Sequence, residues 1–188
     1  VLSFTAGRPE GERFALKSPL HMEPAYMREL IRQYPDAVFI WPHRDMVPVV
    51  RSYCGLYLEL GLMFYTPESL DKHKIGRAVM RGLANRIGGM AAHAERHPES
   101  VLHVSFDELV QRPRAVLDEV LAFAGVRIPE VDAEDFSDRV HDYITESGAA
   151  QASKAGTGAV RLEDFGLSED FIRTRFEEYE AAYCRPRA

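Results

Sequence analysis

Short apolar runs alternate with longer stretches of helical periodicity along this chain. Three of the runs have the length and composition of β-strands, and they cover residues 13–17, 37–41 and 101–106. Brief, nearly continuous apolar runs are typical of strands buried in a parallel sheet. Helical patterns separate the three runs, and this alternation predicts an α/β fold in which helices flank a parallel sheet.

The helical stretches carry start and stop signals. The first ends just before Pro35, and Asp45 is a good N-cap for the second. Pro113 and Gly125 occupy the start and end positions that these residue types favour in helices. Ser168 is a candidate cap for the last helix. We therefore expect helices over residues 23–34, 45–62, 69–97, 112–125 and 167–183.

One tract departs from this pattern. Residues 146–158 are mostly small and have no apolar period, so they predict a flexible loop extending to residue 160. No internal repeat is present, and 188 residues suffice to bury a sizeable core. We therefore treat residues 1–188 as a single domain.

Composition narrows the possible functions. The net charge of -6 predicts no bulk attraction to nucleic acid or to an anionic membrane, so any bound anion needs a local cluster of donors. No apolar run approaches the ~20 residues of a membrane span, and no secretory signal is evident. Cys54 and Cys184 form no C-x-x-C motif. That usage predicts a reducing, cytoplasmic compartment and no metal knuckle.

Charged and titratable side chains follow each of the three expected strands. Lys17 and His21 come after the first strand, Arg44 after the second, and Asp107 with Glu108 after the third. The ligand crevice of an open α/β sheet lies beyond the carboxyl ends of its strands. Parallel strands would therefore gather these side chains at one edge. Asp107 and Glu108 are more often first-turn residues of a helix than an acid–base pair.

The segment around Arg44 has the features of an anion site. The N–H groups at the start of the helix that follows, together with its dipole, favour an anion, and Arg44 adds a planar fork of donors. Ser52 lies about two helical turns beyond Asp45 and on roughly the same side. Arg44 and Ser52 could therefore hold one phosphate between them. The alternative is a surface ion pair between Arg44 and Asp45 or another carboxylate.

Four segments, in order, resemble the bacterial branch of the sulfotransferases that use 3′-phosphoadenosine 5′-phosphosulfate (PAPS). "HRDMVPVVRSY" is similar to the segment in which an arginine, and a serine eight residues later, bind the 3′-phosphate. "FALKSPLH" resembles a K-S-P-x-H segment of that branch. "VSFDELVQRPRAVLDEVLAFAGV" and "RLEDFGLSEDFIRTRFEEYEAAY" resemble its later helical segments. Together they cover more than half of the chain.

The resemblance implies transfer of a sulfuryl group from PAPS to an acceptor hydroxyl or amine of a small molecule, without a metal. It makes His21 the candidate base and Lys17 the group that stabilises charge on the sulfuryl oxygens. It makes Arg44 and Ser52 the 3′-phosphate ligands, and Lys154 a residue that closes over the nucleotide. The fold it implies is a sheet like that of the P-loop NTPases.

The sequence also departs from the family pattern. His21 comes four residues after Lys17, whereas the animal cytosolic branch places its histidine two residues after the lysine. A structural role for His21, capping the helix that follows, is the alternative. Val160 stands where the family's C-terminal glycine-containing loop ends in tryptophan, which weakens the match around Lys154.

The family's 5′-phosphosulfate loop is missing from the sequence. No P-K-S-G-T-like turn and no G-x-x-x-x-G-K motif occurs. We therefore expect a sheet that is incomplete at the N-terminus, the 3′-phosphate-binding half of the site, and little or no catalysis by this chain alone.

Other functions stay open at this stage. A P-loop-type small-molecule kinase would share the sheet and the arginine, and a non-catalytic remnant would bind a nucleotide or a partner protein. His93 and His97 lie four residues apart on an expected helix, but the zincin pattern is absent, so we expect a solvated helix face rather than a metal site. The acceptor is not encoded in any motif, and an oligomer is possible.

Overall fold

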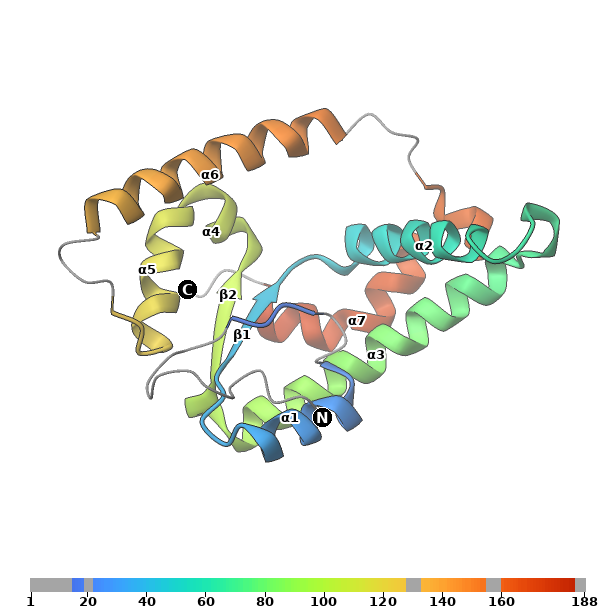
Figure 1. The fold of residues 1–188 in the computed structure, drawn as a ribbon. Coiled ribbons are helices and arrows are strands. Elements are labelled where there is room, and N and C mark those ends of the chain that lie inside the picture. The colour runs from blue at the N-terminus through green and yellow to red at the C-terminus, as the bar shows by residue number, and fades with distance from the viewer. Residues whose placement is uncertain (1–14, 19–21, 128–132, 155–159, 185–188) are drawn as a thin grey trace.

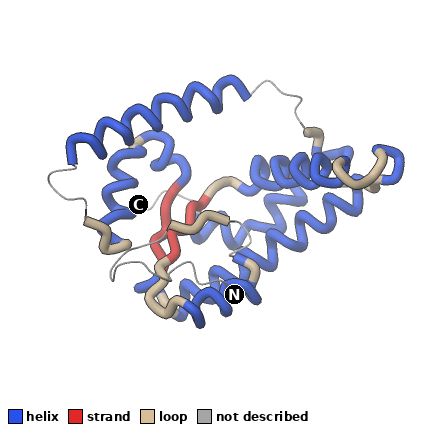
Figure 2. The backbone as a smooth tube through the Cα atoms, in the orientation of Figure 1, coloured by secondary structure: helices blue, strands red, loops and turns tan. Residues whose placement is uncertain are grey.

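The computed structural model of the chain describes residues 15–18, 22–127, 133–154 and 160–184, and the structural statements below concern these residues. Helices dominate, with a small parallel sheet between two groups of them (Figures 1 and 2). The fold is therefore a mostly helical α/β arrangement. Among the residues that the structure describes, no helix is long and apolar enough to cross a membrane.

The sheet consists of β1 (Phe39–His43) and β2 (Val101–Ser105). The two strands are parallel, and their register pairs Phe39 with Val101 at one end and His43 with Ser105 at the other. The chain between them forms two long helices, α2 (Met46–Leu62) and α3 (Lys72–Arg96), and the short 3-10 turns η2 (Pro67–Ser69) and η3 (Pro98–Ser100). Both strands therefore end at the same edge, as the pattern of the sequence predicts.

The core lies on the side of the sheet where α2 and α3 pack together with α7 (Glu169–Tyr183) (Figure 1). Ile172 of α7 and Val50 and Cys54 of α2 are fully buried there. The 3-10 turn η5 (Leu162–Phe165) leads into α7 and buries Leu162 and Phe165 against α3. Segments more than a hundred residues apart in the chain thus share one core.

The remaining helices lie at the margins. α1 (Pro24–Gln33) packs on α3, while α4 (Phe106–Gln111) and α5 (Pro113–Phe123) follow β2 and contact it. α6 (Ala133–Lys154) runs past α4 and α5 in Figure 1. The predicted end of α5 and the predicted start of α7 are both confirmed. Gly125 has a φ of +65° after α5, and the Ser168 side chain accepts from Phe171 N–H as the N-cap of α7.

The first expected strand is wrong for the residues that the structure describes. Ala15–Ser18 have no regular secondary structure, and Leu16 is 60% exposed. A strand needs a ladder partner, and β1 pairs only with β2 within the described part of the chain. Residues 13 and 14 lie outside that part.

Two further boundaries differ from expectation. β1 continues through Pro42 to His43, which fits a strand with a single described partner because proline is tolerated at a sheet edge. The expected loop is also partly wrong, since α6 extends through residues 146–154. Alanine has the highest helix propensity of all residues, and Ala149, Ala150 and Ala152 lie in this stretch.

Close packing of α3 on η5 generates a first prediction. A Cβ added at Gly76 would lie 2.3 Å from the carbonyl oxygen of Phe165. We expect Gly76→Ala to lower the free energy of unfolding by about 1–3 kcal/mol, because a backbone atom must move to relieve the clash. Urea unfolding followed by circular dichroism measures this change.

Gly82→Ala is the matched control in the same helix. An added Cβ there meets no described atom of another element within 4 Å. This substitution should raise the free energy of unfolding by about 0.5–1 kcal/mol through helix propensity. Equal stability of the two variants would contradict the packing of η5 on α3.

Candidate functional site

The candidate site lies at the edge where β1 and β2 both end. Arg44 follows β1 directly, and Phe106 follows β2 as the first residue of α4. The guanidinium carbon of Arg44 lies 4.1 Å from the centroid of the Phe106 ring, and the Arg44 residue is exposed. A guanidinium stacked on a ring keeps its in-plane N–H donors available for an anion. The register of the sheet thus creates the contact that supports Arg44.

The turn after Arg44 is held by two carboxylates. Asp45 caps α2, because its Oδ1 accepts from Val47 N–H at 2.8 Å. Glu180 of α7 approaches the same helix end, and its Oε1 accepts from Met46 N–H at 2.9 Å. The N-cap at Asp45 is confirmed. However, these two N–H groups are already satisfied by the protein itself, so they do not serve an anion as expected.

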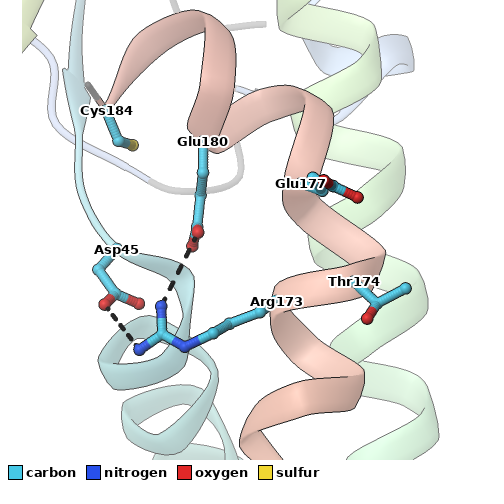
Figure 3. Close-up of a pocket in the computed structure, with 6 residues that line it drawn as sticks. All are labelled: Asp45, Arg173, Thr174, Glu177, Glu180 and Cys184. Atoms are coloured by element: carbon cyan, nitrogen blue, oxygen red, sulfur yellow. Dashed lines mark hydrogen bonds and ion pairs between the residues drawn. The ribbon is translucent and has the colours of Figure 1, made fainter.

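Arg173 links the two carboxylates, as the dashed lines in Figure 3 show. Its Nη2 lies 3.3 Å from Oδ2 of Asp45, and its Nη1 lies 3.9 Å from Oε2 of Glu180. The side chains of Arg173 and Asp45 are about half exposed, so each ion pair contributes little to stability alone. The cluster still balances charge at the start of α2. Asp45, which the alternative interpretation of Arg44 would pair with that arginine, pairs with Arg173 instead.

A cavity of about 470 Å³ adjoins this cluster. Its lining residues come from the α2 cap and from α7: Asp45, Arg173, Thr174, Glu177, Glu180 and Cys184 (Figure 3). Three carboxylates against one guanidinium disfavour a phosphate. The cavity is therefore no candidate for the nucleotide phosphates.

The other expected 3′-phosphate ligand lies on α2. Ser52 is exposed within that helix, and Arg44 precedes the helix and is also exposed. Their sharing of one phosphate stays a prediction. The neighbouring Arg51 donates instead to Glu169 of α7 at 2.9 Å.

The remaining expected site residues are only partly described. Lys17 is exposed in the irregular segment Ala15–Ser18, and His21 lies outside the described residues. Lys154 is the last residue of α6, and its side chain is likewise outside the described part of the structure. The grouping of Lys17 and His21 with Arg44 is therefore untested. Asp107 and Glu108 lie in the first turn of α4, in agreement with a helix-terminal role.

A buried polar network is centred on His43, the residue before Arg44. His43 is 4% exposed; its Nε2 lies 2.8 Å from Nδ1 of His103, and its Nδ1 lies 3.2 Å from the hydroxyl of Tyr179. The ring of Tyr183 stacks on that of His43, with 4.7 Å between centroids. His43 is thus a hydrogen-bonded histidine at the end of a strand.

Burial strongly raises the pKa of Tyr179, and a hydrogen bond from the backbone N–H of Arg44 opposes that rise. Burial also raises the pKa of the Cys184 thiol, and a hydrogen bond with the Tyr179 hydroxyl lowers that pKa. The Tyr179 hydroxyl therefore stays protonated at neutral pH and can both donate and accept.

The roles of Arg173, Tyr179 and Glu180 could not be anticipated. Tyr179 is one of the buried residues of α7. No local signal reveals that its hydroxyl, or the carboxylate of Glu180, reaches a turn more than a hundred residues earlier.

Of the two spaced histidines, at the end of α3 and at its C-cap, only the first differs from the expected solvated face. His93 is buried rather than solvated, with its Nε2 3.1 Å from the hydroxyl of Ser100, because Phe39 of β1 packs edge-on against its ring. Burial lowers its pKa. His97 is exposed. Among the described residues no three His, Cys, Asp or Glu side chains group in a way that could hold a metal ion.

Comparisons with known proteins point to one family. A family model described as "Sulfotransferase family" matches residues 1–130. Among solved structures, the chain is similar to the crystal structure of sulfotransferase STF9 from Mycobacterium avium, with 22% sequence identity and a TM-score of 0.68. That match covers 90% of this chain and 41% of the mycobacterial chain, so the likeness concerns less than half of that protein's length. A comparison with curated proteins gives no match.

The cap at Asp45 generates a second prediction. Asp45→Ala should lower the free energy of unfolding by about 1 kcal/mol, because Val47 N–H loses its acceptor. Asp45→Asn should retain most of that stability, since asparagine is an equally good N-cap. Urea unfolding measures both changes. If asparagine costs as much as alanine, the ion pair with Arg173 rather than the cap stabilises the start of α2.

Proposed function

Because the chain belongs to the sulfotransferase family, we propose that it takes part in moving a sulfuryl group from PAPS to a hydroxyl or amine of a small-molecule acceptor. The observation that carries this proposal is the position of Arg44. It lies within the matched residues 1–130, at the edge where both parallel strands end. Ligands of open α/β sheets bind at that edge.

Arg44 and Ser52 would hold the 3′-phosphate of the nucleotide. The ring of Phe106 supports the flat face of the Arg44 guanidinium, which leaves its N–H groups to bind phosphate oxygens. Because Asp45 and Glu180 already satisfy Val47 N–H and Met46 N–H, attraction of the phosphate depends on these two side chains rather than on those two N–H groups.

The catalytic roles follow from the chemistry of the transfer. His21 would accept the proton of the attacking hydroxyl or amine as the bond between sulfur and the bridging phosphate oxygen breaks. Lys17 would stabilise charge on the sulfuryl oxygens, and Lys154 would close over the nucleotide. These cationic side chains supply the electrostatic stabilisation, so the proposed transfer needs no metal ion.

The proposal assigns to this chain the 3′-phosphate-binding half of the site. Its sequence contains no motif like the family's 5′-phosphosulfate loop, so we expect little or no turnover by the chain alone. Both cysteines are free thiols, which supports a reducing compartment such as the cytoplasm. Nucleotide binding is therefore the appropriate test, since it requires no turnover.

A third prediction concerns adenosine 3′,5′-bisphosphate, the nucleotide product of the proposed transfer. At about 100 times its dissociation constant it should raise the melting temperature by about 5–10 °C, because such binding adds about 2.7 kcal/mol to the free energy of unfolding. Arg44→Ala should remove most of this shift. Arg51→Ala is the matched control, since Arg51 lies on α2, the helix that follows Arg44, and pairs with Glu169.

Two outcomes of this thermal-shift experiment would contradict the proposal. A larger shift with ATP and magnesium that Arg44→Ala leaves intact would favour a small-molecule kinase. The absence of a shift with either nucleotide would favour a domain that binds a partner protein without turnover.

A fourth prediction concerns Ser52. Ser52→Ala should weaken the binding of adenosine 3′,5′-bisphosphate about threefold to tenfold, the change that loss of one hydrogen bond commonly produces. Binding of adenosine 5′-monophosphate, which lacks the 3′-phosphate, should not change. Isothermal titration calorimetry measures both affinities. An equal loss for the two nucleotides would show that Ser52 does not contact the 3′-phosphate.

A further inference from the structure

Helix α7 contacts the residues on both sides of Arg44, a side chain on one side and a backbone N–H on the other. On one side, the hydroxyl of Tyr179 lies 3.2 Å from Nδ1 of His43. On the other side, Oε1 of Glu180 accepts from Met46 N–H at 2.9 Å. Tyr179 and Glu180 are consecutive residues of one helix, and the segment they hold is the turn that presents Arg44. The turn is therefore fixed from outside its own strand and helix.

Glu180 is itself held in place. Its side chain is 21% exposed, and Arg173 lies two turns earlier on the same face of α7. The Arg173 guanidinium points between Glu180 and Asp45 in Figure 3 and approaches an oxygen of each. Asp45 in turn caps α2. The carboxylate that accepts from Met46 N–H thus belongs to a connected set of charged groups.

Tyr179 is held by aromatic packing. Only 9% of the residue is exposed, and its ring centroid lies 5.7 Å from that of His43 and 6.1 Å from that of Trp41. A buried hydroxyl requires hydrogen-bond partners, and this one has the His43 ring beside it. Its protonated state, favoured by burial, keeps the hydroxyl neutral next to the Arg44 backbone N–H. Tyr179 is therefore a rigid support rather than a mobile side chain.

We propose that Tyr179 and Glu180 are positioning residues that preset the Arg44 turn for the 3′-phosphate of the nucleotide. The inference rests on the proposed function, since it takes Arg44 as a phosphate ligand. A phosphate ligand on an unsupported turn loses affinity, because binding must then order the turn. Here the turn is ordered by α7 and the guanidinium by Phe106, so the donors are in place before the ligand arrives.

The experiment separates positioning from a general structural role. Isothermal titration calorimetry gives the dissociation constants of adenosine 3′,5′-bisphosphate and of adenosine 5′-monophosphate for each variant. The dissociation constant of adenosine 5′-monophosphate divided by that of adenosine 3′,5′-bisphosphate is a ratio that measures the contribution of the 3′-phosphate alone. Tyr179→Phe and Glu180→Ala should each lower that ratio about threefold to tenfold, the effect of one lost hydrogen bond. Glu180→Gln should restore most of it, because the amide oxygen can still accept from Met46 N–H.

Two control variants remove the same chemical groups elsewhere on α7. Tyr183→Phe deletes a hydroxyl one turn later, and Glu177→Ala deletes a carboxylate that points away from Arg173 in Figure 3. Both should leave the ratio unchanged. Circular dichroism establishes that each variant is folded at the temperature of titration. If Glu180→Ala does not fold, Tyr179→Phe alone tests the positioning role, because phenylalanine retains the packed ring.

The outcomes distinguish this inference from the proposed function. A wild-type protein without preference for the 3′-phosphorylated nucleotide overturns both. A preference that Arg44→Ala removes, but that Tyr179→Phe and Glu180→Ala leave intact, overturns the positioning role alone. Adding Tyr179→Phe to Arg44→Ala should lower the ratio no further, because the support acts through Arg44. A further loss in that double variant also overturns the positioning role.

Discussion

The parallel pairing of β1 with β2 is the constraint on which the candidate site depends. Its register sets His43 beside Ser105, so the two strands end together and the residues that follow them meet. Arg44 therefore lies over the ring of Phe106, and α2 and α4 both begin at the same edge. A slip of one residue would turn every side chain of a strand to the other face and separate this contact.

Helix α7 adds a second constraint at that edge. It reaches the turn through Tyr179 and Glu180, and it also packs Ile172 and Phe176 into the core. Hydrophobic burial fixes the helix, and two polar side chains transfer that rigidity to the turn that presents Arg44. Helix α7 thus contributes both to the core and to the turn whose Arg44 we propose as a phosphate ligand.

Local patterns in the sequence predicted most of the secondary structure. The apolar runs located β1 and β2, and capping residues such as Asp45 and Ser168 marked the helix starts. The first expected strand failed because a strand is defined by its partner, and the described part of the chain provides none for Ala15–Lys17. The expected helices did not include α6, and a loop was predicted for its alanine-containing end because such segments form helices without an apolar period.

Parts of the site had no local signal. Arg44 was found from its place after a strand, and its spacing to Ser52 suggested a phosphate. The contact of Glu180 with Met46 spans 134 positions of the chain, and it depends on how α7 docks against α2. Side-chain contacts of that range follow from tertiary packing, so only the folded structure reveals that two carboxylates occupy the start of α2.

A crystal structure of the protein with adenosine 3′,5′-bisphosphate tests the central claim most directly. The account predicts a guanidinium nitrogen of Arg44 and the hydroxyl of Ser52 within about 3 Å of oxygens of the 3′-phosphate. The Arg44 turn should retain its contacts with Tyr179 and Glu180 in that complex. A nucleotide whose 3′-phosphate lies elsewhere, with Arg44 directed away from it, would contradict the account.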